Sequence, residues 1–335
     1  MSTPGPDTLR QVKDVSRPTA TFAIALVPET ERAFLGCQDF KVYEVDFAAA
    51  KPEPKELYAH ESYVTGVAAA LGGRVVASGG YDGKLAWWDA EDRRVVRTAD
   101  AHAKWIRKVI ASPDGTLVAS VADDMACKLW DAESGKLVRE LRGHREKTPH
   151  NFTSMLYAVA FSADGKLLAT GDKVGHVVVW DVETGKELAA VEAPVMYTWD
   201  PVQRLHSIGG IRSLAFSPDG RLLAVGGMGK VGNIDHLEGK SRVEVFDWEA
   251  GKRAVEFPGD KFNGLVNALR FAPDGSWLLG AGGAGEGFLQ FYDVAAKKVL
   301  RQEKLPMHVH DVALSESGDA IYSVGHNRIV VHKLG

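Results

Sequence analysis

The sequence has only two cysteines, Cys37 and Cys127, among 335 residues. So small a number argues against a disulfide scaffold, and because each cysteine falls in or near an expected strand, we expect buried, reduced thiols. Long hydrophobic runs are also lacking: no stretch approaches the length of a membrane span, and residues 1–14 have no apolar core of the kind that a secretory signal needs. We therefore expect a cytoplasmic protein without a membrane attachment.

Charge of one sign is not in large excess either. The 40 Lys and Arg residues and the 44 Asp and Glu residues give a net charge of −4. This balance predicts no strong electrostatic attraction to nucleic acid or to an anionic membrane. Apolar stripes with helical spacing are hard to find, whereas glycine is abundant, with 35 residues. The combination favours many short strands joined by tight turns.

What the sequence does contain is an internal repeat, centred on residues 77–89, ASGGYDGKLAWWD. Two successive units carry the same polar side chains at the same offsets, namely His60, Ser78, Asp82 and Trp88, then His102, Ser120, Asp124 and Trp130. In both units 22 residues separate His from Asp, and 6 separate Asp from Trp. A repeat of this length with one aromatic-Asp pair per unit is typical of a β-propeller blade. The chain resembles the WD-repeat β-propeller family.

Seven segments fit a common inner-strand pattern, which predicts seven blades. Their anchor residues are Ile24, Val67, Val109, Val159, Leu214, Leu269 and Val312. In every segment the matching position of the second strand follows 11 residues later. The resemblance implies an all-β fold, a seven-bladed β-propeller of four-stranded antiparallel blades, in one domain over residues 1–335. We expect the blades at about residues 19–58, 59–100, 101–142, 143–191, 192–257, 258–303 and 304–335.

The last expected blade has three strands of its own, ending in RIVVHKL, and needs a fourth. Residues 9–15, LRQVKDV, precede the first inner strand and resemble the outer strand LVRELRG of residues 137–143. In WD-repeat propellers an N-terminal strand commonly completes the last blade. We therefore expect residues 9–15 to complete blade seven, because each repeat buries its faces only against its neighbours.

The His, Ser and Asp residues of each polar set are also the residue types of a hydrolase triad. A nucleophile is needed once, however, whereas this set occurs twice, each time with a Trp whose ring N–H needs an acceptor when buried. The resemblance implies instead a structural hydrogen-bonded tetrad that runs from Trp through Ser or Thr and His to Asp. Blade four has Thr170 and Trp180 but Val174 at the Asp position, so we expect no complete tetrad there or in blades one, five, six and seven.

Other signals for ligand chemistry are weak. His308 and His310 have the alternate spacing that places two imidazoles on one face of a strand, but a zinc site needs three or four protein ligands. The glycine-rich stretches GGMGKVGN and GAGGAGEG lack the Gly-Lys-Ser/Thr ending of a phosphate-binding loop. We therefore expect no metal and no cofactor.

Loop lengths vary on only one side of the expected blades. The step from the third strand of one blade to the first strand of the next takes 21 residues after blade two, 29 after blade three and 34 after blade four. The additional residues lie at 145–154 and 193–210, and insertions on a rigid scaffold often carry binding residues. Tyr197 and Trp199 in the second insertion favour protein recognition. The alternative is that they only anchor the long loop on its own blade.

The family also uses positions at the start of the inner strand and before the tetrad Asp. By alignment these positions hold Tyr63, Tyr81, Trp105, Arg107, Asp123, Tyr157, Lys173 and Arg212. Trp, Tyr and Arg dominate the energetics of protein interfaces. The sequence therefore favours a non-catalytic scaffold with no enzyme activity. We expect it to bind a protein or peptide through the loop-rich face near blades two to five, and a role as a subunit of a larger assembly fits this expectation.

Two other classes of function remain open. One is a propeller enzyme or small-ligand binder that uses the mouth of the central channel with His308, His310 and Arg107. The other is a nucleic-acid-binding protein, which the acidic balance and the lack of a basic patch disfavour.

Overall fold

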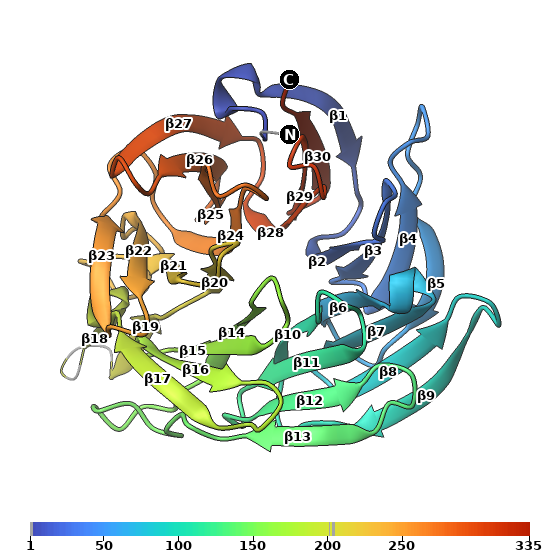
Figure 1. Cartoon of the computed structure of the whole chain (residues 1–335), viewed down its shortest axis with the longest axis horizontal. Helices are drawn as coiled ribbons and strands as arrows, with labels where there is room; N and C mark the ends of the chain where they lie inside the picture. Colours follow the sequence, from blue (N-terminus) through green and yellow to red (C-terminus); the bar gives the residue numbers. More distant parts are fainter. Residues whose placement is uncertain (1–2, 201, 203–204) are drawn as a thin grey trace. The chain divides into compact units, whose positions relative to one another are not determined.

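The computed structural model describes residues 3–200, 202 and 205–335. In this part of the chain the regular structure consists of β-strands and three short 3-10 helices, η1 (Pro6–Thr8), η2 (Leu71–Gly73) and η3 (Pro194–Met196). The strands form seven four-stranded antiparallel sheets and one two-stranded hairpin. The protein is therefore an all-β, seven-bladed β-propeller, which confirms the predicted fold (Figure 1). Among the described residues, no helix combines the length and the apolar character that crossing a membrane requires.

The chain divides into two compact units. The four-blade unit contains residues 8–141 and 310–335, and the three-blade unit contains residues 1–7 and 142–309. The organisation of residues 1–335 as one domain remains a prediction.

The four-blade unit contains blades one, two, three and seven. Blade one consists of β2 (Thr21–Leu26), β3 (Arg32–Cys37), β4 (Lys41–Asp46) and β5 (Lys55–Ala59). Blade two consists of β6 (Val64–Ala70), β7 (Val75–Gly80), β8 (Lys84–Asp89) and β9 (Arg94–Asp100). Blade three consists of β10 (Ile106–Ala111), β11 (Leu117–Ala122), β12 (Cys127–Asp131) and β13 (Leu137–Leu141). Blade seven consists of β28 (Val309–Leu314), β29 (Ala320–Gly325), β30 (Arg328–Lys333) and β1 (Arg10–Ser16).

The N-terminal strand β1 is the outer strand of blade seven, as predicted. It pairs antiparallel with β30, from Arg10 opposite Lys333 to Ser16 opposite Arg328. An ion pair of 2.6 Å between Arg328 and Asp14 lies on the same pair of strands. The closing strand therefore joins residues near the two ends of the chain in one sheet (Figure 1).

The three-blade unit contains blades four, five and six. Blade four consists of β14 (Leu156–Phe161), β15 (Leu167–Asp172), β16 (His176–Asp181) and β17 (Glu187–Glu192). Blade five consists of β20 (Ser213–Phe216), β21 (Leu222–Met228), β22 (Ser241–Asp247) and β23 (Lys252–Phe257). Blade six consists of β24 (Leu265–Phe271), β25 (Leu278–Gly283), β26 (Gly287–Asp293) and β27 (Lys298–Leu305).

The predicted insertion 193–210 contains a hairpin that the repeat pattern did not indicate. Strand β18 (Tyr197–Asp200) pairs antiparallel with β19 (His206–Gly209). Residues 201, 203 and 204 of this insertion lie outside the described residues. The hairpin is therefore a small sheet of its own between blades four and five along the chain.

The constant 11-residue spacing corresponds to direct pairing between the first two strands of a blade. Val67 lies opposite Ser78 in blade two, and Val109 lies opposite Ser120 in blade three. Blades one, four, five and six show the same register. The register has a local cause in the turn of blade three, where the Ser112 hydroxyl donates to Asp114 at 2.5 Å and accepts the Leu117 amide N–H at 2.9 Å.

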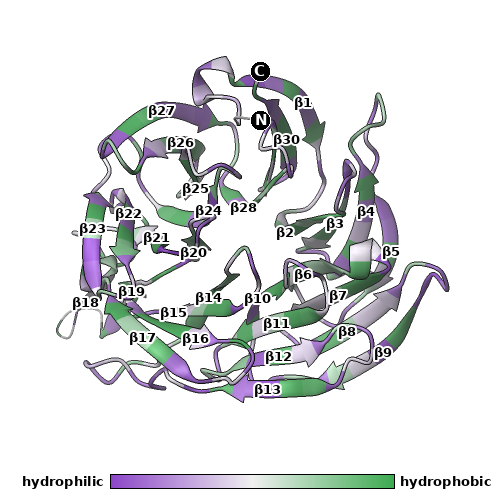
Figure 2. Ribbon diagram, viewed as in Figure 1, coloured by the Kyte–Doolittle hydropathy of each residue, from purple (hydrophilic) through white to green (hydrophobic). Residues whose placement is uncertain are grey.

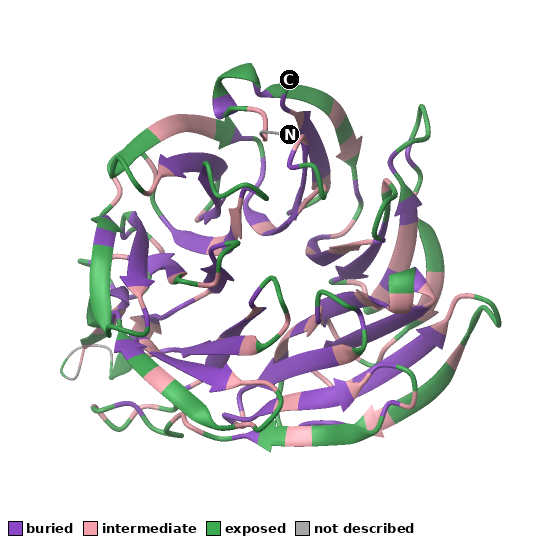
Figure 3. Cartoon of the chain, in the orientation of Figure 1, coloured by how far each residue is buried: buried purple, intermediate pink, exposed green. Residues whose placement is uncertain are grey.

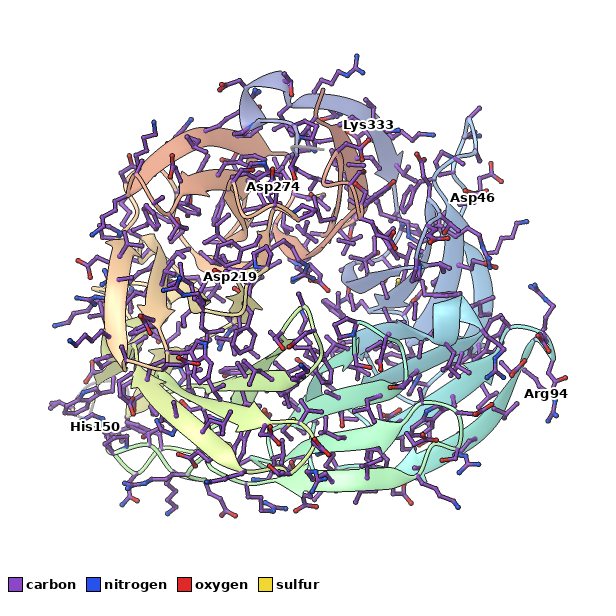
Figure 4. The ribbon with its side chains drawn as sticks, viewed as in Figure 1. Asp46, Arg94, His150, Asp219, Asp274 and Lys333 are labelled. Carbon is purple, nitrogen blue, oxygen red and sulfur yellow. The ribbon has the colours of Figure 1, made fainter. Side chains whose placement is uncertain are left out.

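Equivalent aspartates stand in the turns of other blades, and Figure 4 labels two of them, Asp219 and Asp274. The Ser217 hydroxyl donates to Asp219 at 2.5 Å, and the Ser276 hydroxyl donates to Asp274 at 2.6 Å. These bonds to the carboxylate lower the pKa of both aspartates. The turns of these blades therefore hold charged carboxylates that accept hydrogen bonds from nearby hydroxyl groups.

Within each unit the core lies between neighbouring blades, where apolar residues of the inner and middle strands pack together. Figure 2 shows apolar residues along strands such as β11 and β16, and Figure 3 shows these strands buried while outer strands such as β9 and β13 are largely exposed. Between blades two and three, Trp87 packs edge-to-face against Trp130 with ring centroids 5.8 Å apart. Polar outer strands leave the free edge of each blade to solvent.

Candidate functional site

The predicted tetrad of blade three forms a continuous chain of hydrogen bonds. The Trp130 ring N–H donates to the Ser120 hydroxyl at 3.0 Å, and Ser120 lies 2.8 Å from His102 Nε2. His102 Nδ1 is 3.1 Å from both oxygens of Asp124. Because a carboxylate only accepts, Nδ1 carries the proton and Nε2 accepts from Ser120. The direction of donation therefore runs from Trp to Ser to His to Asp.

Asp124 is charged in this network. Burial alone would raise the pKa of its carboxyl group, but the hydrogen bond from His102, with those from the backbone amides of Ala126 and Ala103, lowers it to about 2. The network therefore holds a carboxylate whose acceptor sites are used by protein groups.

Blade two has the same His and Asp contacts but a different first member. His60 lies 2.7 Å from Ser78 and 3.0 Å from Asp82. The hydrogen bond to Ser78 that the sequence assigned to Trp88 is made instead by the Tyr58 hydroxyl of β5, at 2.8 Å. The Trp88 ring stacks near Tyr58 with centroids 6.5 Å apart. The assignment of Trp88 was wrong because the partner comes from the outer strand of the preceding blade, where the offsets of one repeat do not reach.

Blade four has a complete tetrad, so the prediction that it lacks one was wrong. Trp180 donates to Thr170 at 2.9 Å, and His144 lies 2.8 Å from Thr170 and 3.0 Å from Asp172. The Asp comes two residues before Val174, where the offsets placed it, and the His comes before the insertion 145–154, so that 28 residues separate the pair. A Thr followed two residues later by Asp, after an upstream Gly-His, is the signal that fixed offsets missed.

These three networks are closed to substrates. The side chains of His102 and His144 are 0% and 2% exposed. A hydrolase needs a nucleophile that a substrate can reach, whereas here each hydroxyl and each imidazole is enclosed and bonded within its blade. Their geometry fits a structural role, in which a fully satisfied buried network holds the third strand to the loop that enters the blade.

The surroundings of His308 and His310 do not indicate a metal site, although the His310 ring lies edge-to-face against His326 with centroids 4.7 Å apart. Both ring nitrogens of His308 lie within hydrogen-bond distance of protein groups, 2.9 Å from the Asn267 amide and 2.9 Å from the Ala284 carbonyl oxygen. The His310 ring packs against Phe22 at 5.0 Å. Among the residues that the structure describes, no group of three or more His, Cys, Asp or Glu side chains could hold a metal ion.

Aromatic rings at the loop ends of blades one to three form a continuous series of contacts in the four-blade unit. We name Phe22, Phe40, Tyr63, Tyr81 and Trp105 the aromatic row. Ring centroids lie 5.8 Å apart from Phe22 to Tyr63 and 5.6 Å apart from Phe40 to Tyr63. They lie 5.6 Å apart from Tyr63 to Tyr81 and 4.3 Å apart from Tyr81 to Trp105, where the two rings are parallel within 8°. The Trp105 side chain is 48% exposed.

Arg107 fixes the end of the aromatic row. Its guanidinium binds Asp123 through two hydrogen bonds of 2.7 and 2.6 Å and donates to the Tyr81 hydroxyl at 2.9 Å. It also lies 5.2 Å from the centroid of the Tyr81 ring and 5.3 Å from that of Trp105. A surface held in this way is rigid before a partner binds, so less conformational entropy is lost on binding.

Beside the row lies a hollow of about 370 Å³. Its lining residues are Tyr81, Asp82, Gly83, Ala103, Lys104, Trp105 and Asp123. Gly83 has a φ of +74°, and a side chain there would meet the His102 carbonyl oxygen at 2.5 Å. Glycine therefore permits the close turn that shapes the hollow.

The predicted residues of the three-blade unit form two separate contacts. The Arg212 guanidinium lies 3.5 Å from the centroid of the Tyr157 ring, and Lys173 is buried, with its ammonium group 3.4 Å from the Thr153 carbonyl oxygen. The structure thus brings Arg212 onto Tyr157, a pair of residue types common at protein interfaces, but buries Lys173.

Tyr197 and Trp199 contact the other insertion, not only their own blade. The His150 ring stacks on Trp199 with centroids 3.6 Å apart and lies 5.8 Å from the Tyr197 ring (Figure 4, His150). The two insertions therefore anchor each other, while Trp199 remains 39% exposed.

A family model described as "WD domain, G-beta repeat" (WD40) matches residues 52–89, 93–131, 135–181, 199–231 and 251–293. The chain belongs to the WD40 repeat family. The WD40 matches omit most of blades one and seven, where the aromatic residue of the third strand is replaced by Val45 and His332. The matched ranges together cover more than half of the chain.

Several curated proteins are similar to parts of this WD40 chain. Protein hir-1 of Neurospora crassa is 34% identical over 141 residues, which are 38% of this chain and 13% of that protein. Human apoptotic protease-activating factor 1 is 38% identical over 96 residues, or 28% of this chain and 7% of that protein. The LEC14B homolog of Prunus armeniaca is 25% identical over 177 residues, or 51% of this chain and 34% of that protein. The matched regions thus span a minor part of each relative.

Proposed function

We propose that this WD40 chain is a non-catalytic scaffold that binds a protein or peptide partner, and that the aromatic row with Arg107 is its principal contact surface. The observation that carries the proposal is the exposed Trp105 ring stacked on Tyr81 and held by the Arg107–Asp123 ion pair. Large aromatic and Arg side chains in fixed positions are the residues that contribute most to binding energy at interfaces.

The charges of this surface support recognition in place of catalysis. Asp123 is paired with Arg107, and Asp82 accepts from His60 and from the Lys84 amide N–H. A general base or a nucleophile needs a group that is poised to react with a bound substrate. Here both carboxylates are used to hold loops in place, which leaves ring faces as the main contact groups.

The loops of blades four and five support a second contact region. Arg212 over Tyr157 forms one patch, and Trp199 with Tyr197 and His150 forms the other. We propose that these residues extend the recognition surface of the three-blade unit, with buried Lys173 serving to position its loop. The similarity to parts of protein hir-1 and of apoptotic protease-activating factor 1 supports the proposal of a scaffold.

Affinity purification with the full-length chain tests the proposal. Partners captured by the wild type are quantified by mass spectrometry and compared with those captured by Trp105→Ala and by Val96→Ala, a control on outer strand β9 with a similarly exposed side chain. Trp105→Ala should weaken the binding of the specific partner by about 1–2 kcal/mol, or about 5- to 30-fold. If Trp105→Ala binds that partner as well as Val96→Ala does, the aromatic row is not the contact surface.

A further inference from the structure

The carboxylates beside the aromatic row are already occupied, which limits the chemistry of a partner. Both oxygens of Asp123 accept hydrogen bonds from Arg107, and Asp82 lies 3.0 Å from His60 and accepts the amide N–H groups of Glu61 and Lys84. A Lys or Arg side chain of a partner would therefore have to displace an existing bond to form an ion pair here. A cationic anchor is disfavoured at this site.

In contrast to these carboxylates, the Lys104 side chain is not part of an ion pair in the described structure. It lines the hollow beside Trp105 and is exposed. The nearby Lys84 is paired with Glu61 at 2.9 Å. The open charge at the hollow is thus positive, and a carboxylate of the partner would complement it.

The aromatic row itself favours a flat, uncharged side chain in an extended segment. Tyr63, Tyr81 and Trp105 follow one another at ring spacings of 5.6 and 4.3 Å. One turn of a polyproline II helix, three residues with a rise of about 3.1 Å each, covers about 9 Å, slightly less than these two ring spacings together. Aromatic-lined surfaces recognise this conformation because its proline rings stack on them and its backbone loses little entropy on binding.

We infer that the aromatic row binds an extended, proline-containing segment in the polyproline II conformation, with a proline stacked at Trp105 and an acidic residue beside it paired with Lys104. This inference rests on the proposed function of the same surface. The hollow accommodates a side chain of proline size, and the row lies at the ends of blades, away from the outer strand edges at which an added β-strand would pair.

Synthetic peptides test the inference without the natural partner. The probe is a dodecapeptide of four Pro-Pro-Asp repeats, and the comparison peptides are four Pro-Pro-Lys repeats and four Gly-Ser-Asp repeats, which separate the charge from the conformation. Binding to the full-length chain is measured by isothermal titration calorimetry. The Pro-Pro-Asp peptide should bind at least ten-fold more tightly than either comparison peptide.

Variants assign the two contacts. Trp105→Ala should abolish the binding of the Pro-Pro-Asp peptide, and Lys104→Glu should reverse the preference toward the Pro-Pro-Lys peptide. Lys298→Glu, an exposed change on outer strand β27, is the matched control and should leave both affinities unchanged. Thermal melts confirm that each variant is folded.

The outcomes separate the inference from the proposed function. Equal affinity for the three peptides, no measurable binding, or retention of binding in Trp105→Ala overturns the inference. If no peptide binds while Trp105→Ala still loses the captured partner, the proposed recognition surface is supported and only its preference for the polyproline II conformation is refuted. If Trp105→Ala keeps the captured partner, the proposed function falls as well.

Discussion

Replacement of Asp172 by Ala is the sharpest perturbation of the tetrad in blade four. Its carboxylate accepts His144 Nδ1 and the amide N–H groups of Val174 and His176, each at 3.0 Å. The side chains of Asp172 and His144 are each 2% exposed. Removal of the carboxylate therefore leaves three donors without their acceptor in a place that water reaches poorly.

The magnitude follows from the number of donors and their burial. A buried donor left unsatisfied costs about 1–3 kcal/mol, and breaking a buried charged contact costs about 3–5 kcal/mol. We expect Asp172→Ala to lower the free energy of unfolding by about 3–5 kcal/mol. Val174→Thr, at the half-buried position that the repeat offsets assigned to the Asp, should change it by less than about 1 kcal/mol.

Urea unfolding of the full-length chain, followed by tryptophan fluorescence, measures the difference. The midpoints and slopes of wild type, Asp172→Ala and Val174→Thr are compared at the same pH and ionic strength. If Asp172→Ala is no less stable than Val174→Thr, the hydrogen-bonded tetrad of blade four does not contribute as the structure indicates.

Three further predictions concern the same fold. Trp130→Phe should destabilise the chain by about 1 kcal/mol more than Trp88→Phe in urea unfolding, because of these two rings only that of Trp130 donates its N–H to a tetrad hydroxyl; equal losses would contradict this. The folded-state pKa of Asp124, about 2, lies below the usual value of about 3.9, so the contribution of its carboxylate to stability is complete above about pH 4 and is lost as the pH falls toward 2. Between about pH 4 and pH 2 the urea midpoint of Asp124→Ala should therefore fall less steeply than that of the wild type. Parallel profiles of midpoint against pH would refute this prediction. Deletion of residues 1–16 removes β1 from blade seven and should lower the melting temperature by several degrees; an unchanged melt would show that β30 does not need this partner.

The repeat register could be predicted from the sequence because its cause is local. In blades three, four and five the turn within the 11-residue spacing uses short-range hydrogen bonds of Ser112, Asp114 and their equivalents, and local bonds of this kind are encoded within a few residues. The fourth strand of blade seven was predictable for a related reason, since an outer-strand pattern preceded the first repeat. Blade count and closing strand therefore follow from patterns within the chain.

The contacts that the sequence missed join separate repeats or cross an insertion. In blade two the Tyr58 hydroxyl, from the preceding blade, takes the place of the Trp88 ring N–H. In blade four the insertion 145–154 places His144 26 residues before Thr170, whereas His and Ser are 18 residues apart in blades two and three, so a fixed offset finds neither contact. The aromatic row was predicted only at Tyr63, Tyr81 and Trp105. Phe22 and Phe40 were missed because they lie in blade one, which has no tetrad to set the alignment.

The ion pair at the end of the row could not be predicted as a pair. Arg107 and Asp123 were each named as binding residues, but 16 residues and a strand turn separate them, and sequence spacing does not show that their side chains meet. Their pairing changes the expected chemistry of the surface, because it leaves Lys104 as the open charge beside the rings. The ion pair between Arg107 and Asp123 thus determines which charge of a partner this surface favours.

The most direct test of the recognition surface is hydrogen-deuterium exchange of the full-length chain with and without the partner captured by affinity purification. We expect slower exchange on binding in residues 59–65, 79–85 and 101–108, which carry most of the aromatic row and Lys104. The turn at residues 111–117, at the other end of blade three, should be unchanged. Protection confined to that turn and its equivalents in other blades, with none at residues 101–108, would contradict the proposed surface.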